Sequence, residues 1–311
     1  MTVAFVFPGQ GSQSIGMLNT LADTYPQVRE TFAEASAALG YDLWAIVSSG
    51  LEDKLNQTET TQPAMLSAGV AVWRVWQVEK GAQPVIMAGH SLGEYTALTC
   101  AGALDFSDAV KLVADRGRFM QEAVPAGQGG MAAIVGLDDE QVQALCGQAA
   151  QGEILAAVNF NAPGQVVVAG TAGAVARAVE QAKGAGAKLA KILPVSVPSH
   201  CALMHPAALR MRERLQSVTI KPATIPVLHN VSVKSESNAQ GIRDALVQQV
   251  ESPVRWVETI RYMAAMGVGK LVECGPGRVL TGLNKRIVKD VPTLPVYDPQ
   301  TLRTALSALT S

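Results

Sequence analysis

Short apolar segments alternate with longer segments of helical periodicity along most of the chain, and this alternation restricts the possible folds strongly. The apolar segments have no polar face, which is typical of strands in a parallel sheet that helices cover on both sides. The expected strands are Val3–Phe7, Val85–Gly89, Lys191–Val197, Ile225–Asn230 and Lys270–Glu273. The expected helices are Pro26–Leu39, Gln62–Lys80, Leu92–Ala101, Phe106–Ala123, Ala202–Leu215, Asn238–Val250 and Val257–Met266. The sequence therefore predicts an α/β fold with a mainly parallel sheet flanked by helices.

A second pattern interrupts the first between residues 128 and 195. Its expected elements follow the order strand, helix, strand, strand, helix, strand, and they are Gly130–Gly136, Asp138–Ala150, Ile154–Asn159, Gln165–Ala169, Ala172–Ala185 and a strand from Lys188 onward. This order is the ferredoxin-like arrangement. We therefore expect a small inserted subdomain at 128–195 within a large catalytic domain made of 1–127 and 196–311.

Composition excludes several classes of function. Charged residues make up 16% of the 311 residues, against an average of roughly 25%, and their net charge is −1. With 48% hydrophobic residues, the chain predicts a large core rather than disorder. It shows no basic excess for nucleic acid and no apolar stretch of about 18 residues for a membrane span.

The cysteines and the first residues suggest where the protein works. Cys100, Cys146, Cys201 and Cys274 are far apart and form no Cys-x-x-Cys pair, so we expect reduced thiols, no disulfides and no metal site. The chain begins without the basic region of a signal peptide. These features predict a cytoplasmic protein.

The segment Gly89-His90-Ser91-Leu92-Gly93 matches the pattern Gly-x-Ser-x-Gly between an expected strand and an expected helix. That context is typical of a nucleophile elbow, in which the glycines permit the sharp turn that projects the serine. The Leu92 N–H would then face a developing oxyanion. The alternative is that Ser91 caps the helix, with Glu94 completing a capping box.

A serine nucleophile needs a base, and His200 is favoured because it follows an expected strand end and precedes a helix, although it could be an ordinary structural histidine. No acid follows a strand end between residues 91 and 200. The backbone carbonyl of Gln249, near the end of its helix before Pro253, could accept the His200 N–H instead. A merely buried Gln249 is the alternative.

Two further features could bind substrate. Arg116 lies on an apolar helix face with Leu112 and Met120, so it predicts a buried fork for a planar carboxylate, or alternatively an internal salt bridge. Arg118, three residues after Asp115, is instead expected to be a solvated partner of that acid. In the first loop, glycines flank Gln10, which could supply a second oxyanion donor or belong to a plain tight turn.

Seven motifs occur in the order and spacing of a known family: Phe7-Pro-Gly-Gln-Gly-Ser-Gln13, Gly89-His-Ser-Leu-Gly-Glu94, Arg116-Gly117, Met131-Ala-Ala133, Asn159-Phe-Asn161, Pro198-Ser-His200 and Gly275-Pro-Gly277. From residue 3 to about residue 290, the chain resembles the bacterial malonyl-CoA:acyl-carrier-protein transacylases of type II fatty-acid synthesis. The resemblance implies a hydrolase-like α/β domain with the ferredoxin-like insertion.

The resemblance also implies a mechanism. Ser91 attacks the malonyl thioester of malonyl-CoA with His200 as base, and Gln10 and Leu92 form the oxyanion hole. Arg116 binds the malonyl carboxylate, and the carbonyl of Gln249 orients the histidine. The phosphopantetheine thiol of acyl carrier protein then takes the malonyl group in a ping-pong second half, so the enzyme needs no cofactor of its own.

Other functions stay open at this point. The same elbow serves serine thioesterases and esterases, a related subunit loads malonyl onto the carrier of malonate decarboxylase, and a non-catalytic carrier-binding module is a third possibility. Because the family's carrier is acidic, we expect a basic docking patch near the Gly275-Pro-Gly277 turn, unless it is only a solvated helix face. Its candidate residues are Arg278, Lys285, Arg286 and Lys289.

Overall fold

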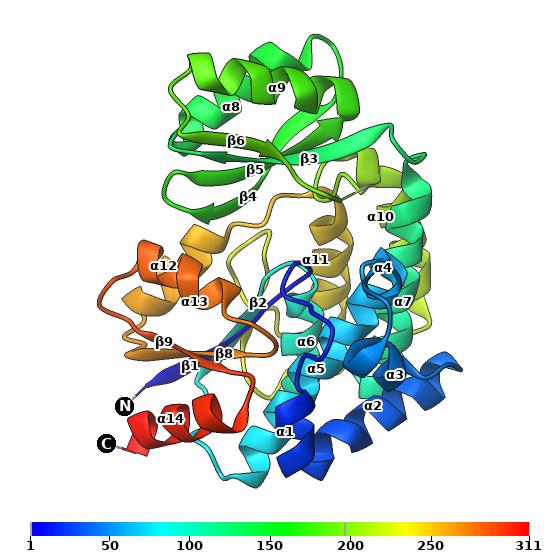
Figure 1. Cartoon of the computed structure of the whole chain (residues 1–311), viewed down its shortest axis with the longest axis vertical. Helices are drawn as coiled ribbons and strands as arrows, with labels where there is room; N and C mark the ends of the chain where they lie inside the picture. Colours follow the sequence, from blue (N-terminus) through cyan, green and yellow to red (C-terminus); the bar gives the residue numbers. More distant parts are fainter. Residues whose placement is uncertain (1, 196, 311) are drawn as a thin grey trace.

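The computed structural model describes residues 2–195 and 197–310 and contains two sheets, one above the other in Figure 1. The larger sheet is entirely parallel and has the strand order β7-β2-β1-β8-β9. Its strands are β1 (Val3–Phe7), β2 (Ile86–Gly89), β7 (Val227–Leu228), β8 (Lys270–Cys274) and β9 (Thr293–Val296). Residues of β1 alternate between two cores, with Phe5 and Phe7 in one and Ala4 and Val6 in the other.

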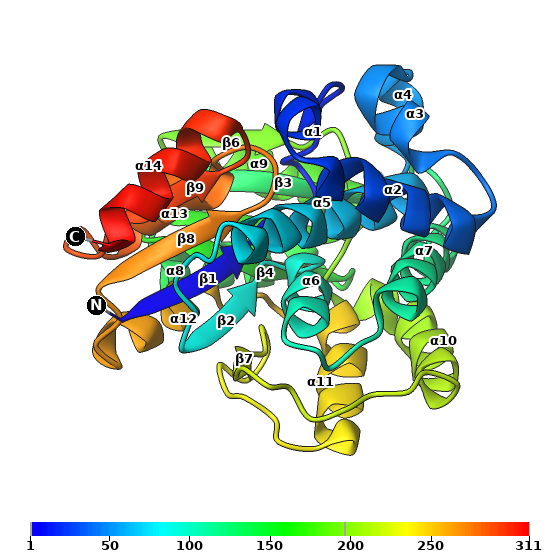
Figure 2. The same cartoon turned by 90° about the horizontal axis from the view of Figure 1, so that it is seen from below.

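Helices cover both faces of the larger sheet. The face with Phe5 packs against α5 (Thr58–Val78), α6 (Gly93–Cys100) and neighbours, and the face with Ala4 packs against α12 (Trp256–Ala265) and α13 (Val279–Ile287) (Figure 2). The other helices around this sheet are α1 (Asn19–Thr24), α2 (Pro26–Leu39), α3 (Leu43–Ser49), α4 (Glu52–Leu55), α7 (Phe106–Ala123), α10 (His205–Gln216), α11 (Ala239–Glu251), α14 (Pro299–Thr310) and the short 3₁₀ turn Ala202–Met204. The prediction of an α/β fold with a parallel sheet is confirmed.

The smaller sheet is antiparallel, with the strand order β4-β5-β3-β6. It consists of β3 (Gly129–Val135), β4 (Leu155–Ala162), β5 (Gln165–Thr171) and β6 (Leu189–Ile192), and the helices α8 (Asp139–Ala150) and α9 (Ala172–Gly184) cover its outer face (Figure 1). The inner face carries a small core that includes Met131, Val167 and Cys201. The sequence order of strands and helices is the one expected for the ferredoxin-like insertion.

Several expected boundaries were wrong. The strand predicted at Lys191–Val197 ends at Ile192, because Pro194 has no N–H for a sheet ladder; Ser196 lies outside the described residues. The predicted linker from Phe160 belongs in part to β4, which runs to Ala162, and α5 starts four residues before Gln62. The edge strand β9 and helix α14 were missed.

The chain ends lie near each other beside α14 in Figure 1. Across the described residues, no helix has the length and apolar character to cross a membrane.

Candidate active site

Ser91 lies in a sharp turn between β2 and α6, at the carboxyl end of the parallel sheet. Its backbone is left-handed, with φ 50°, a conformation that costs energy for a residue with a side chain. A Cβ on Gly89 would lie 1.8 Å from the Gly93 carbonyl carbon, and one on Gly93 would lie 2.1 Å from the Phe7 oxygen. Both positions therefore need glycine, because the backbone passes too close for a side chain. The alternative that Ser91 only caps the helix does not account for the two glycines, and no side-chain cap is found at the start of α6 among the described residues.

His200 faces the serine directly. Its Nε2 lies 2.8 Å from the Ser91 Oγ, and its Nδ1 lies 2.8 Å from the Gln249 carbonyl oxygen and 3.2 Å from that of Ser252. Because carbonyl oxygens only accept, Nδ1 carries the hydrogen and Nε2 is free to accept the serine proton. Burial, and then the charge of Arg116, lowers the pKa of His200 to about 3, so the imidazole is neutral near neutral pH.

The local structure that holds His200 in this position differs from the one that the sequence predicted. It does not close a strand, since β6 ends at Ile192, and its backbone N–H donates to the Val250 oxygen at the end of α11. The other histidines have different surroundings. His229 is buried against Glu94, the exposed His205 contacts Glu251, and His90 lies in the cavity wall with its Nε2 2.7 Å from the Asn161 Oδ1.

Arg116 is almost fully buried on α7, at 1% exposure. Its guanidinium donates to the Oε1 atoms of Gln62 and Gln249, each at 2.9 Å, and its Nη2 lies 3.4 Å from the Ser91 Oγ. No ion pair among the described residues involves Arg116, and its Nε has no hydrogen-bond partner there. The salt-bridge alternative was therefore wrong, whereas Arg118 does pair with Asp115 at 2.7 Å.

A cavity of about 220 Å³ connects these groups and lies between the two sheets. Its polar lining includes Ser91, His200 and Arg116. Its apolar lining comes from α7, the smaller sheet, the segment after β6, and α13: Met120, Met131, Val167, Leu193, Leu280 and Leu283. An apolar lining beside a buried cation lowers the local dielectric constant and so strengthens the electrostatic attraction between that cation and an anionic ligand.

Gln10 and Leu92 both line this cavity. Leu92 is the residue before the first turn of α6, where N–H groups lack intrahelical partners. The first loop passes close by, because a Cβ on Gly9 would lie 2.5 Å from the His90 oxygen and 3.7 Å from the Leu92 nitrogen. The two expected oxyanion donors are thus brought to the side of Ser91.

Comparison with known proteins decides the family. The model of the acyl transferase domain matches residues 4–299. A malonyl CoA-acyl carrier protein transacylase of Salmonella typhimurium is 57% identical over 304 residues, covering 98% of each chain, and that of Bacillus subtilis is 44% identical over 308 residues, covering 99% of this chain and 97% of the relative. The chain belongs to the malonyl CoA-acyl carrier protein transacylase family.

Solved structures of this family have the same fold. The Coxiella burnetii transacylase superposes with a TM-score of 0.99 at 50% identity, covering 100% of this chain and 98% of the other. A malonyl-transacylase solved in complex with a type II polyketide-synthase acyl-carrier protein has a TM-score of 0.98 at 55% identity, covering 99% and 100%.

The four candidate docking residues lie on or next to α13, whose inner side lines the cavity with Leu280 and Leu283. All four, Arg278, Lys285, Arg286 and Lys289, are exposed. Arg286 also contacts the Gln165 side chain and donates to the Pro163 oxygen at 3.2 Å, so it bridges α13 and the smaller sheet.

Sequence reasoning missed three buried polar residues of this transacylase site: Gln62, Glu94 as a network residue, and Asn230. Glu94 was considered only as a helix cap, but its carboxylate is fully buried and accepts from His229, Asn230 and Gln249. The available signal was the glutamate in the first turn of an otherwise apolar helix, since a buried carboxylate needs hydrogen-bond donors.

Proposed function

We propose that the protein transfers the malonyl group of malonyl-CoA to the phosphopantetheine thiol of an acyl carrier protein, through a malonyl ester on Ser91. The observation that carries this proposal is the buried Arg116 cation, which lies 3.4 Å from the Ser91 Oγ without a carboxylate partner among the described residues. A serine hydrolase of neutral acyl groups has no use for such a cation. The relatives are malonyl CoA-acyl carrier protein transacylases by name, which supports the same substrates.

In the first half of the reaction, the Ser91 hydroxyl gives its proton to His200 Nε2 while its oxygen attacks the thioester carbonyl carbon. Donors at Leu92 and Gln10 stabilise the oxyanion, and Arg116 holds the malonyl carboxylate in a bidentate pair. When the carbon–sulfur bond breaks, the CoA sulfur takes the proton from His200. The Gln249 carbonyl, 2.8 Å from Nδ1, stabilises the transient imidazolium.

The second half runs in reverse with another thiol. The carrier's thiol gives its proton to His200 Nε2, its sulfur attacks the ester carbonyl, and the Ser91 oxygen leaves with that proton. No metal or bound cofactor enters this sequence, because the phosphopantetheine belongs to the carrier. We also propose that the reaction takes place in the cytoplasm, which fits the four free cysteines.

Intact-mass spectrometry tests the proposal. Mixing the protein with malonyl-CoA should give a malonyl adduct that maps to Ser91, and adding holo acyl carrier protein should move the adduct to the carrier thiol. Ser91→Ala should form no adduct. Loss of the adduct to water at the same rate with and without carrier would instead identify a thioesterase and reject the transferase.

A further inference from the structure

A buried hydrogen-bond network behind the nucleophile has Glu94 at its centre. Its carboxylate is fully buried, and it accepts from His229 Nδ1 at 2.7 Å, from the Asn230 backbone N–H at 2.9 Å and from Gln249 Nε2 at 3.0 Å. All three partners donate, so the carboxylate acts only as an acceptor. Glu94 is not among the residues that line the cavity. It reaches the reacting groups through these partners, and its charge also acts directly on Arg116 by raising the pKa of that side chain against the effect of burial.

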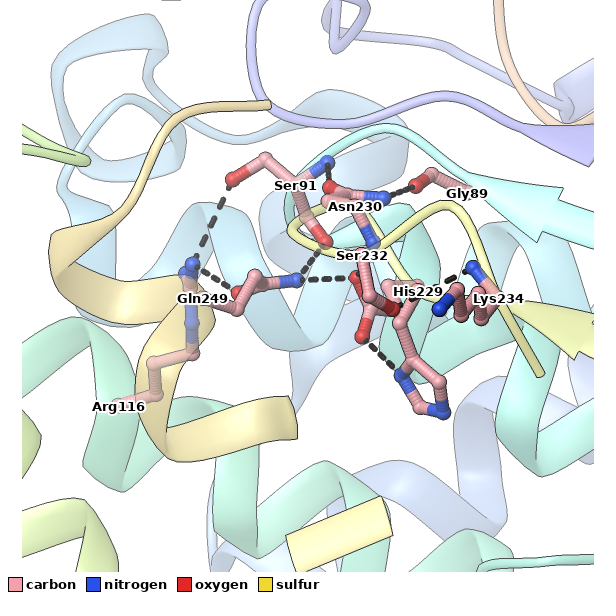
Figure 3. Close-up of polar contacts among 9 residues, drawn as sticks. Gly89, Ser91, Arg116, His229, Asn230, Ser232, Lys234 and Gln249 are labelled. Atoms are coloured by element: carbon pink, nitrogen blue, oxygen red, sulfur yellow. Dashed lines mark hydrogen bonds and ion pairs between the residues drawn. The ribbon is translucent and has the colours of Figure 1, made fainter. Parts of the chain in front are cut away.

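One arm of the network leads through Asn230 to the strained serine backbone. The Asn230 side chain accepts from the Ser91 N–H at 2.7 Å and donates to the Gly89 oxygen at 2.6 Å, so it clamps both sides of the turn (Figure 3). Since Ser91 has φ 50°, the turn needs contacts that stabilise it against relaxation. Glu94 holds the Asn230 backbone that carries this clamp.

The other arm leads through the Gln249 side chain to Arg116. Gln249 Nε2 donates to Glu94. It also donates to the Ser91 carbonyl oxygen at 2.8 Å, while its Oε1 accepts from Arg116 Nη2 at 2.9 Å (Figure 3). A carboxylate can only accept and a guanidinium can only donate, so these two neighbours permit a single orientation of the amide. The Gln249 backbone carbonyl separately faces His200.

We propose that Glu94 is a positioning residue for the transfer reaction: through Asn230 it holds the Ser91 turn, and through the Gln249 amide it holds Arg116 at the cavity. This inference rests on the proposed function for its Arg116 arm only. The serine arm concerns the reactivity of Ser91 toward any electrophile.

Two variants separate the arms. Asn230→Ala removes the clamp on the turn, and we expect the rate at which a fluorophosphonate labels Ser91 to fall about 100-fold, the scale of a 1 Å misplacement. Gln249→Ala keeps the backbone carbonyl that faces His200 but frees Arg116. It should lower the malonyl-over-acetyl ratio of kcat/KM about 10-fold or more. Its effect on labelling should be smaller than that of Asn230→Ala, because it removes the one bond to the Ser91 carbonyl oxygen and leaves the Asn230 clamp in place.

Two variants then test Glu94 itself. Glu94→Ala should lower both the labelling rate and the malonyl-over-acetyl ratio. Glu94→Gln should restore most of both, because its amide oxygen can accept from Asn230 and Gln249 while its NH₂ group donates to His229 in the other ring tautomer. In a double-mutant cycle, Glu94→Ala and Gln249→Ala should be less than additive in the ratio, since they act along one path.

Glu273→Ala is the matched control for Glu94→Ala. Glu273 is equally buried, and among the described residues its carboxylate accepts from Leu280 and Thr281 alone, at the start of α13. We expect this variant to lower the melting temperature while the labelling rate of Ser91 stays within about 2-fold of the parent, because its partners do not include the Ser91 turn.

The proposal is overturned if Glu94→Ala, like the control, changes only the melting temperature. It is also overturned if Glu94→Gln and Glu94→Ala lose labelling and selectivity equally. A parent enzyme that is labelled at Ser91 but does not transfer malonyl would reject the proposed function instead, and the labelling rates would still decide the serine arm.

Discussion

The guanidinium of Arg116 is held by two neutral amide oxygens, at 2.9 Å each, and by no carboxylate among the described residues. Its burial lowers the pKa of Arg116 from the usual value, yet a guanidinium stays protonated in proteins. A buried cation with neutral partners gains most from an incoming carboxylate. We therefore propose that substrate selectivity depends mainly on this side chain.

Arg116→Ala should lower kcat/KM for malonyl-CoA by about 30- to 1000-fold, corresponding to roughly 2–4 kcal/mol for truncating one partner of a buried charge pair. The rate with acetyl-CoA, measured in parallel, should change far less, because acetyl has no carboxylate. Equal losses with both substrates would contradict the carboxylate assignment.

The protonation of His200 can be followed through the reactivity of Ser91. Because burial and the Arg116 charge lower the pKa of His200 to about 3, the rate of fluorophosphonate labelling should stay level as the pH falls through about 6.5, the ordinary histidine value. In Arg116→Ala the neighbouring charge is gone, so the acid limb should move to higher pH. A limb near the ordinary value in both proteins would disprove the depressed pKa.

Sequence reasoning at this scale succeeded where a role is local and failed where it depends on distant segments. The turn at Ser91 follows from two glycines within five residues. The pairing of Ser91 with His200 was expected, and the Ser91 Oγ lies 2.8 Å from the His200 Nε2. Glu94 meets Asn230 and Gln249 across 136 and 155 residues of sequence. No periodicity or spacing reports which distant donors will meet a buried carboxylate, so its network was missed.

At the scale of elements, helices with clear start signals were predicted to the residue. Helix α2 begins at Pro26, and α7 begins after Asp105, whose side chain accepts from Ser107 and Asp108; both match cap positions that a sequence displays. Strand β9 was missed because it contains Pro295, which only an edge strand tolerates. The position of β9 at the sheet edge, beside β8, is seen only in the folded structure, so the sequence could not show that this proline is tolerated.

Helix α13 carries the element-scale prediction. Lys285 and Lys289 are exposed on and just after α13, the helix that lines the cavity with Leu280 and Leu283. We propose that they meet the acidic surface expected of the carrier. Charge reversal with Lys285→Glu and Lys289→Glu should raise the KM for acyl carrier protein and weaken or reverse the rise of that KM with salt, with the KM for malonyl-CoA unchanged.

Arg286 is a poorer choice for this test, because its contacts with Pro163 and Gln165 tie α13 to the smaller sheet. A matched control is Lys183→Glu on α9, on the outer face of that sheet, which should leave the KM for carrier protein unchanged. A rise in both KM values, or in neither, would remove the basic patch from the docking surface.

At the scale of the whole molecule, the two sheets enclose a site that neither contains alone. Ser91 follows a strand of the larger sheet, while Met131 and Val167 close the cavity from the smaller one. A site enclosed in this way excludes water from the acyl-enzyme. It also places ionisable groups where they are poorly solvated, and the free energy of unfolding then depends on pH.

Burial lowers the pKa of His90 as well as that of His200, so both bind a proton less readily in the folded protein than in an unfolded chain, which protonates them below about 6.5. The contribution of these two neutral histidines to the free energy of unfolding is therefore complete above about pH 6.5. It is lost as the pH falls from there toward their pKa values in the folded protein. Glu273, whose pKa is raised by burial from its usual value of 4.5, has the opposite sign: its contribution is lost as the pH rises from about 4.5 toward its folded value, so it opposes the histidine slope wherever the two ranges overlap. Urea unfolding at pH values between about 7.5 and 5.5 should show a stability that falls by up to about 1.4 kcal/mol per pH unit for His200. His200→Gln should make that slope shallower, and an unchanged slope would show that the histidine is already protonated in the fold.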